Sequence, residues 1–111
     1  VADLPPTAVT PEIRLDTPDT IKFELVKQVQ ERLAGYVRSR QPIGPGKDIV
    51  REVVTIDGVR AVFQDGWGLI RASNTQPALV LRFEAASPDR LTAIRAAVEG
   101  ELAAVKRTMH S

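Results

Sequence analysis

The residues of this chain that could do chemistry are concentrated in one stretch, RASNTQP, which runs from Arg71 to Pro77. Arg71 carries a planar fork of N–H donors that matches a phosphate or carboxylate group. Ser73 and Thr75 add hydroxyls, Asn74 adds an amide, and the backbone N–H groups of a turn can converge on an anion. The stretch contains no carboxylate, histidine or lysine. It can therefore bind a phosphate group, but it cannot transfer one by itself.

The same residue types are also typical of an ordinary turn. Ser, Asn and Thr are common in turns because their side chains hydrogen-bond to the nearby backbone. In that interpretation Arg71 is simply solvated. Residue types alone leave both interpretations open, so the flanking elements have to be considered.

The composition restricts the class of protein. With 111 residues, of which 43% are hydrophobic, the chain has room for one domain with a real core. A net charge of +1 does not favour binding to nucleic acid or to a membrane surface. The absence of cysteine excludes disulfides, thiolate zinc sites and cysteine nucleophiles. No apolar run reaches the ~18 residues of a membrane span, and no signal peptide is recognisable, so we expect a cytoplasmic protein.

The N-terminal part predicts a linker, a strand and a helix. Residues 1–11 are rich in Pro, Ala and Thr, which predicts an interdomain linker and a chain that is part of a longer protein. Ile13 and Leu15 alternate with polar residues as in a strand. Thr17-Pro18-Asp19 predicts a helix start with Thr17 as the N-cap, and Lys22 is assigned to the polar face of that helix. Its apolar stripe consists of Ile21, Leu25, Val29, Leu33 and Val37.

From Ile49 the apolar period changes from about four residues to two, which predicts four consecutive strands. Asp57-Gly58 and Asp65-Gly66 predict hairpin turns between the first three, and Gly68 is likewise assigned to the needs of a turn. Ser87-Pro88-Asp89 repeats the helix-start pattern. The strands have the sequences IVREVVTI, VRAVFQ, WGLIRA and ALVLRFEA.

The predicted order is therefore strand, helix, four strands, helix. An α+β fold, with a mostly antiparallel sheet and two helices packed on one face, buries both helical stripes and the alternating strand faces. We expect residues 12–108 to form this domain and residues 109–111 to be a frayed tail.

The stretch DGWGLIRASNTQPALVLRFEA resembles the C-terminal, fourth domain of the α-D-phosphohexomutases. That family carries a phosphate-binding loop of the form Arg-x-Ser-Asn/Gly-Thr-x-Pro, followed by a strand that ends near Glu-Ala. TPEIRLDTPDTIKFELV and VTIDGVR are also similar to that domain, so the resemblance covers nearly the whole chain. Asn74, where other branches have glycine, indicates the bacterial phosphomannomutase/phosphoglucomutase branch, whereas Gln76 stands where many relatives have glutamate. The matching residues are Arg71, Ser73, Asn74, Thr75, Pro77, Glu84 and Ala85.

The resemblance implies a fold like that of the TATA-box-binding protein and a four-domain enzyme that interconverts hexose 6-phosphates and hexose 1-phosphates. A phosphoserine, Mg²⁺ and a hexose 1,6-bisphosphate activator belong to the full-length enzyme, and this domain is expected to bind no cofactor. Its partners would be the mannose or glucose phosphate substrate and the other domains of the same chain. Arg71, Ser73, Asn74 and Thr75 would hold the phosphate that is not transferred while the domain closes the cleft. No catalytic residue or metal ligand is expected on this chain, so the isolated domain should be inactive.

Two other functions stay open. The chain can be a stand-alone phosphosugar- or anion-binding module with a regulatory role and no catalysis. Alternatively, the sheet can bind nucleic acid or protein, which requires basic and aromatic residues on its exposed face. One Trp, one Tyr and three Phe give this second alternative little support.

Overall fold

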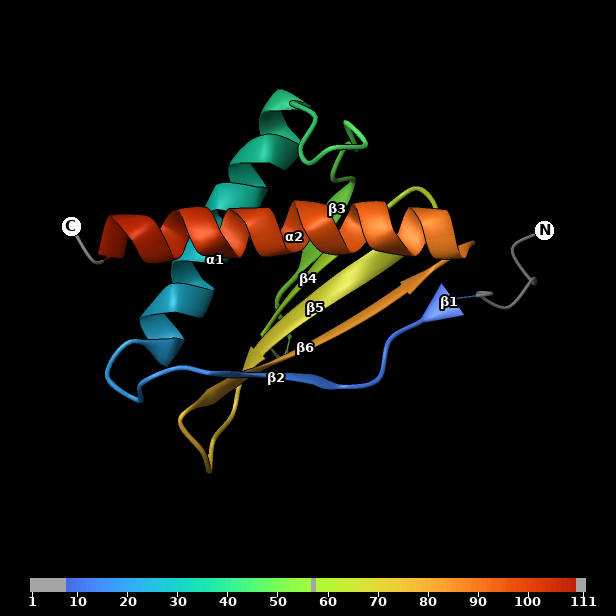
Figure 1. Ribbon diagram of the computed structural model, residues 1–111. Helices are drawn as coiled ribbons and strands as arrows, with labels where there is room; N and C mark the ends of the chain where they lie inside the picture. Colours follow the sequence, from blue (N-terminus) through green and yellow to red (C-terminus); the bar gives the residue numbers. More distant parts are fainter. Residues whose placement is uncertain (1–7, 57, 110–111) are drawn as a thin grey trace.

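The structure, a computed structural model, describes residues 8–56 and 58–109 and has the α+β architecture that the sequence predicts. Within these residues, two helices, α1 (Lys22–Ser39) and α2 (Pro88–Met109), cover a six-stranded antiparallel sheet (Figure 1). The remaining residues of the predicted linker, hairpin turn and tail (1–7, 57, 110–111) lie outside the described residues. The strands are β1 (Ala8–Val9), β2 (Ile13–Asp16), β3 (Glu52–Val54), β4 (Val59–Phe63), β5 (Gly66–Ala72) and β6 (Ala78–Ala85).

Strands β1 and β2 share one edge of β6, in a sheet of order β1-β6-β5-β4-β3. In the break between them, the Thr10 hydroxyl oxygen accepts a hydrogen bond from the backbone N–H of Phe83, at 3.1 Å. The Thr10 N–H donates in turn to the Phe83 carbonyl, at 3.0 Å. Residues 8–11 were expected to belong to the linker, but Ala8 is buried and pairs with Ala85. The sheet therefore begins earlier than the sequence pattern indicates.

The core lies between the two helices and one face of the sheet. Helix α1 contacts β3, β4 and β5, whereas α2 contacts β5, β6 and β1. Alternate residues of β6 face this core, as predicted, and are at most 1% exposed: Leu79, Leu81, Phe83 and Ala85. Fully burying each large apolar side chain stabilises the fold by roughly 1.5–3 kcal/mol.

The two predicted helix starts have different outcomes. At α2 the prediction is confirmed, because the Ser87 hydroxyl oxygen accepts a hydrogen bond from the Arg90 N–H at 3.2 Å. At α1 it is wrong. The Thr17 hydroxyl donates to the Leu15 carbonyl, its N–H donates to the Pro77 carbonyl, and the helix begins only at Lys22. Thr17 is held by the neighbouring strand and loop, so it is not available as a cap.

The C-terminal end of the fold also differs from the prediction. Met109, which was assigned to a frayed tail, is the last residue of α2. Its side chain packs against the core. Apolar contact therefore keeps the last turn of the helix in place.

Gly68 lies inside β5, where the sequence assigned it to the needs of a turn. It faces α2. A Cβ at this position would lie 2.8 Å from the ring of Phe83 and 3.0 Å from a methyl group of Val98. Glycine here allows the helix to pack closely on the sheet.

Tyr36 lies where α1 meets α2. Arg32 of α1 donates a hydrogen bond to the carboxylate of Glu101 in α2, and its guanidinium lies 5.9 Å from the centre of the Tyr36 ring. Burial raises the pKa of Tyr36 above its ordinary value, and the negative charge of Glu101 raises it further, against the opposing effect of Arg32.

The Tyr36 phenolate should therefore form at higher pH in the folded chain than in urea. Because folding favours the neutral phenol, this contribution to stability is present below pH ~10 and is lost as the pH rises through the folded pKa. Tyr36 is the only tyrosine, so near-ultraviolet phenolate absorbance measures it alone. Glu101→Gln should lower the midpoint of the folded chain. An unchanged midpoint in this variant would show that the carboxylate has no influence on Tyr36.

Candidate functional site

The loop between β5 and β6 is held together by its own hydrogen bonds. The Ser73 N–H donates to the Ala78 carbonyl at 2.9 Å, which closes the loop at its base. The Ser73 hydroxyl oxygen accepts hydrogen bonds from the N–H groups of Gln76, at 3.2 Å, and of Thr75, at 3.4 Å. Since two amides direct their hydrogens at this oxygen, the hydroxyl hydrogen is left to point elsewhere and can be donated to a ligand.

The structure places the four predicted phosphate-binding residues on this one loop and the strand before it. Arg71 lies near the end of β5 with 40% of its side chain exposed. Ser73 is half-buried, and Asn74 and Thr75 are exposed. Arg71 and Asn74 line a common pocket, whereas Ser73 and Thr75 are not among its lining residues.

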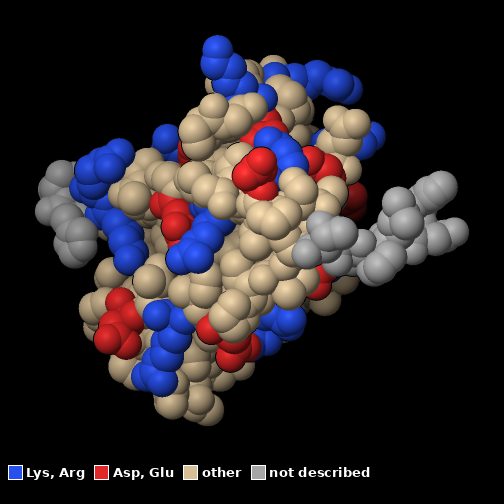
Figure 2. Space-filling model, turned by 45° about the vertical axis from the view of Figure 1, so that its right-hand side comes forward, with Lys and Arg blue, Asp and Glu red and all other residues tan. Residues whose placement is uncertain are grey.

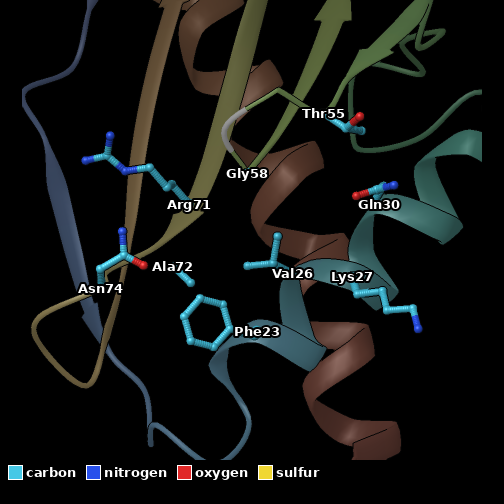
Figure 3. Close-up of a pocket in the computed structure, with 9 residues that line it drawn as sticks. All are labelled: Phe23, Val26, Lys27, Gln30, Thr55, Gly58, Arg71, Ala72 and Asn74. Atoms are coloured by element: carbon cyan, nitrogen blue, oxygen red, sulfur yellow. The ribbon is translucent and has the colours of Figure 1, made fainter.

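The pocket is an open hollow between this loop and α1. Figure 3 shows Arg71 and Asn74 extending on one side of it, whereas Phe23 and Val26 reach in from α1 on the other. Its polar groups are cationic or neutral, and no carboxylate or imidazole occurs among the described residues that line it. The full lining is Phe23, Val26, Lys27, Gln30, Thr55, Gly58, Arg71, Ala72 and Asn74.

Gly58 allows the turn between β3 and β4 to approach Arg71. Its φ of +88° lies in the left-handed region, which a side chain disfavours. A Cβ at Gly58 would lie 3.0 Å from the Cα and 3.1 Å from the Cβ of Arg71. The turn glycine that the DG pattern predicts is therefore also a direct neighbour of the arginine of the loop. Asp57, its partner in that pattern, lies outside the described residues.

Arg71 also faces a carboxylate. Its guanidinium lies 3.9 Å from Glu12, whose side chain is 61% exposed. Such an exposed pair contributes at most about 1 kcal/mol. The contact is weak enough for an anionic ligand to replace.

Lys22 lies in this region, contrary to the prediction from the sequence. It was assigned to the polar face of α1, but it is only 4% exposed. Its ammonium donates to the carbonyl of Gln76 in the loop at 2.9 Å and lies 2.7 Å from the carboxylate of Asp19. The spacing contains the signal, because Lys22 falls on the same helical face as the buried Val26, Val29 and Leu33. At this position the helical spacing predicts burial better than the residue type does.

Three other properties of the described residues concern metal ligands, membrane helices and surface charge. Among the described residues, no group of three or more His, Cys, Asp or Glu side chains could hold a metal ion. No helix in this part of the chain is long and apolar enough to cross a membrane. On the face shown in Figure 2, basic and acidic side chains are interspersed and form no large patch of one sign. This face lacks the basic field of a nucleic-acid-binding surface.

The fold and the site together define an α+β domain with a candidate anion-binding loop at one end of its sheet. Residues 12–101 match the family model described as "Phosphoglucomutase/phosphomannomutase, C-terminal domain". The chain therefore belongs to the phosphoglucomutase/phosphomannomutase family and corresponds to its C-terminal domain, as the sequence resemblance indicated.

Relatives and a solved structure agree with this assignment. The chain is 38% identical over 100 residues to the phosphomannomutase/phosphoglucomutase of Pseudomonas aeruginosa PAO1, a match that covers 90% of the chain and 19% of that protein. It is 42% identical over 94 residues to the Pseudomonas putida protein of the same name, covering 85% of the chain and 18% of the relative. A crystal structure of a phosphoglucomutase/phosphomannomutase family protein from Burkholderia thailandensis superposes with a TM-score of 0.65 at 36% identity, over 95% of this chain and 19% of that one. The chain thus spans about a fifth of the length of these proteins.

Proposed function

We propose that this chain is the phosphate-binding domain of an enzyme that interconverts hexose 6-phosphates and hexose 1-phosphates, with mannose or glucose phosphate as substrate. Arg71, Ser73, Asn74 and Thr75 hold the phosphate that is not transferred. The observation that carries the proposal is the arrangement of these four residues on one hydrogen-bonded loop and the end of β5, beside a pocket whose described lining residues include no carboxylate. Membership of the family supports it.

The loop would act by positioning. Phosphoryl transfer depends on geometry and on stabilisation of charge, so a group that fixes the distant phosphate orients the reacting one. Arg71 provides two parallel donors, and the hydroxyl hydrogen of Ser73 provides a third because the oxygen is already occupied by two amides. Asn74 and Thr75 are exposed and can close around the ligand.

The transfer itself would be carried out by other domains of the full-length enzyme. The loop offers no general base and no nucleophile with a base beside it. A phosphoserine, Mg²⁺ and a hexose 1,6-bisphosphate activator belong to those domains in this proposal. This domain closes over the cleft in the cytoplasmic enzyme and is inactive alone.

A titration followed by amide chemical shifts tests the phosphate site. The ¹⁵N-labelled chain is titrated with glucose 6-phosphate and with mannose 1-phosphate, and unphosphorylated glucose serves as the ligand control. We expect shifts confined to Arg71–Thr75, with none for glucose and none in Arg71→Ala. Arg82→Ala is the matched control, because Arg82 is exposed on the neighbouring strand β6. Shifts that persist in Arg71→Ala, or that scatter over the whole surface, would contradict the proposed site.

A further inference from the structure

Lys22 is the only charged residue that is buried among the described residues. Its side chain is 5% exposed, although the carboxylate of its partner Asp19 is 68% exposed. Burying an ammonium is costly unless it is paired and hydrogen-bonded. A lysine that served only an ion pair with Asp19 would reach into water, as most lysines do. The position of Lys22 beneath the loop therefore calls for a further role.

The contact of Lys22 with the loop is specific. Its ammonium donates to the carbonyl of Gln76 at 2.9 Å, and the same carbonyl accepts a hydrogen bond from the Ala78 N–H at 2.8 Å. The peptide group of this carbonyl ends at Pro77, which has no N–H. The carbonyl is thus the only polar group of that peptide, and two donors fix its direction.

Lys22 also connects the loop to the opposite wall of the pocket. It is the first residue of α1, and its ammonium lies 5.1 Å from the centre of the Phe23 ring. Phe23 and Val26 of the same helix line the wall of the pocket opposite Arg71 and Asn74. The Lys22 side chain therefore connects α1, which forms one wall of the pocket, to the loop that forms the other.

We propose that Lys22 is a positioning residue for the phosphate loop, an inference that rests on the proposed function. Its ammonium holds the Gln76 carbonyl, and with it the loop, in the conformation in which Arg71, Ser73 and Asn74 can bind one phosphate. It also places a positive charge under the loop. Asp19 pairs with that charge and reduces the cost of burying it.

The test is Lys22→Met in the full-length enzyme, because methionine retains the apolar stem and removes the ammonium. We expect KM for the phosphosugar to rise about tenfold, with a smaller fall in kcat, as a lost charge-assisted hydrogen bond predicts. In the ligand-free ¹⁵N-labelled chain, the amides of Ser73–Gln76 should shift. Lys22→Arg, which keeps a donor and the charge, should restore most of the affinity. Lys106→Met on α2 is the matched control, with wild-type KM and wild-type loop shifts.

The outcomes separate this inference from the proposed function. If Arg71→Ala raises KM but Lys22→Met leaves KM and the loop shifts at wild-type values, the role of Lys22 is refuted and the phosphate site stands. If neither variant changes KM, the proposed phosphate site is refuted as well. If Lys22→Met does not fold, Lys22→Leu takes its place, and a wild-type KM in that variant refutes the inference.

Discussion

Replacing Arg71 with alanine in the full-length enzyme is expected to raise KM for the phosphosugar and to lower kcat. Loss of a charge-assisted hydrogen bond costs roughly 1.5–3 kcal/mol, so kcat/KM should fall about 10- to 150-fold. Both constants should change, because in the proposed function the loop holds the substrate by its phosphate in either orientation. Steady-state kinetics with glucose 1-phosphate and with mannose 1-phosphate measure the effect.

Two further variants determine what the arginine contributes. Arg71→Lys keeps the charge but loses the planar fork, so its kcat/KM should lie between that of the wild type and that of Arg71→Ala. Arg82→Ala removes an exposed arginine that lies opposite Leu69 on β5, two residues before Arg71. It should change kcat/KM less than about twofold, as is usual for a surface charge without a specific contact. Equal losses of kcat/KM in Arg82→Ala and Arg71→Ala would mean that the positive charge of the domain matters only through its general electrostatic field.

Much of the fold could be predicted from the sequence because its signals are local. Alternation in β6 and the stripe of α2 depend on which side chains face a core, and the Ser87 cap depends on three consecutive residues. The predictions that proved wrong concern residues whose partners are distant in the sequence. Ala8 is part of a strand because β6 offers it a free edge, and Thr17 cannot cap α1 because the loop at Pro77 holds its backbone.

In the candidate site, too, local sequence signals could be recognised, whereas contacts between distant parts of the chain could not. The loop residues are contiguous, so their types and order can be recognised in the sequence itself. The residues of the opposite wall cannot be recognised in the sequence, because only the fold brings Phe23 and Thr55 to the pocket. Gly68 shows the same limit: nothing near it in sequence indicates that α2 crosses this point of β5.

The second large effect is expected on stability, from an ion network centred on Arg90. Arg90 donates hydrogen bonds to Asp48, in the segment between α1 and β3, and to Asp65 in the turn between β4 and β5, at 2.6 Å for the latter. These contacts raise the pKa of Arg90, mainly through Asp65 and then Asp48. A raised pKa means that folding favours the charged form. The contribution of the Arg90 charge is therefore present at neutral pH and is lost only in strong alkali, as the pH rises through the pKa of Arg90.

Arg90→Met should destabilise the chain by about 2–3 kcal/mol, below the 3–5 kcal/mol typical of a fully buried pair. The expected loss of stability is smaller because the network is partly exposed to solvent. The Arg90 side chain is 31% exposed and that of Asp65 is 30% exposed. Asp48 is the main source of the cost, because its side chain is only 11% exposed and would keep its charge after its ion-pair partner is removed. Urea unfolding at neutral pH measures the change.

Arg95→Met is the matched control for this prediction. Arg95 lies on the same helix and pairs with Glu99 one turn along at 3.0 Å, but these side chains are 45% and 37% exposed. Its loss should cost only about 0.3–0.5 kcal/mol. Adding Asp48→Ala to Arg90→Met should recover part of the lost stability, because the second change removes the charge that was left buried. Equal costs for Arg90→Met and Arg95→Met would show that the Arg90 network stabilises no more than a surface pair, and that apolar packing alone holds these three segments together.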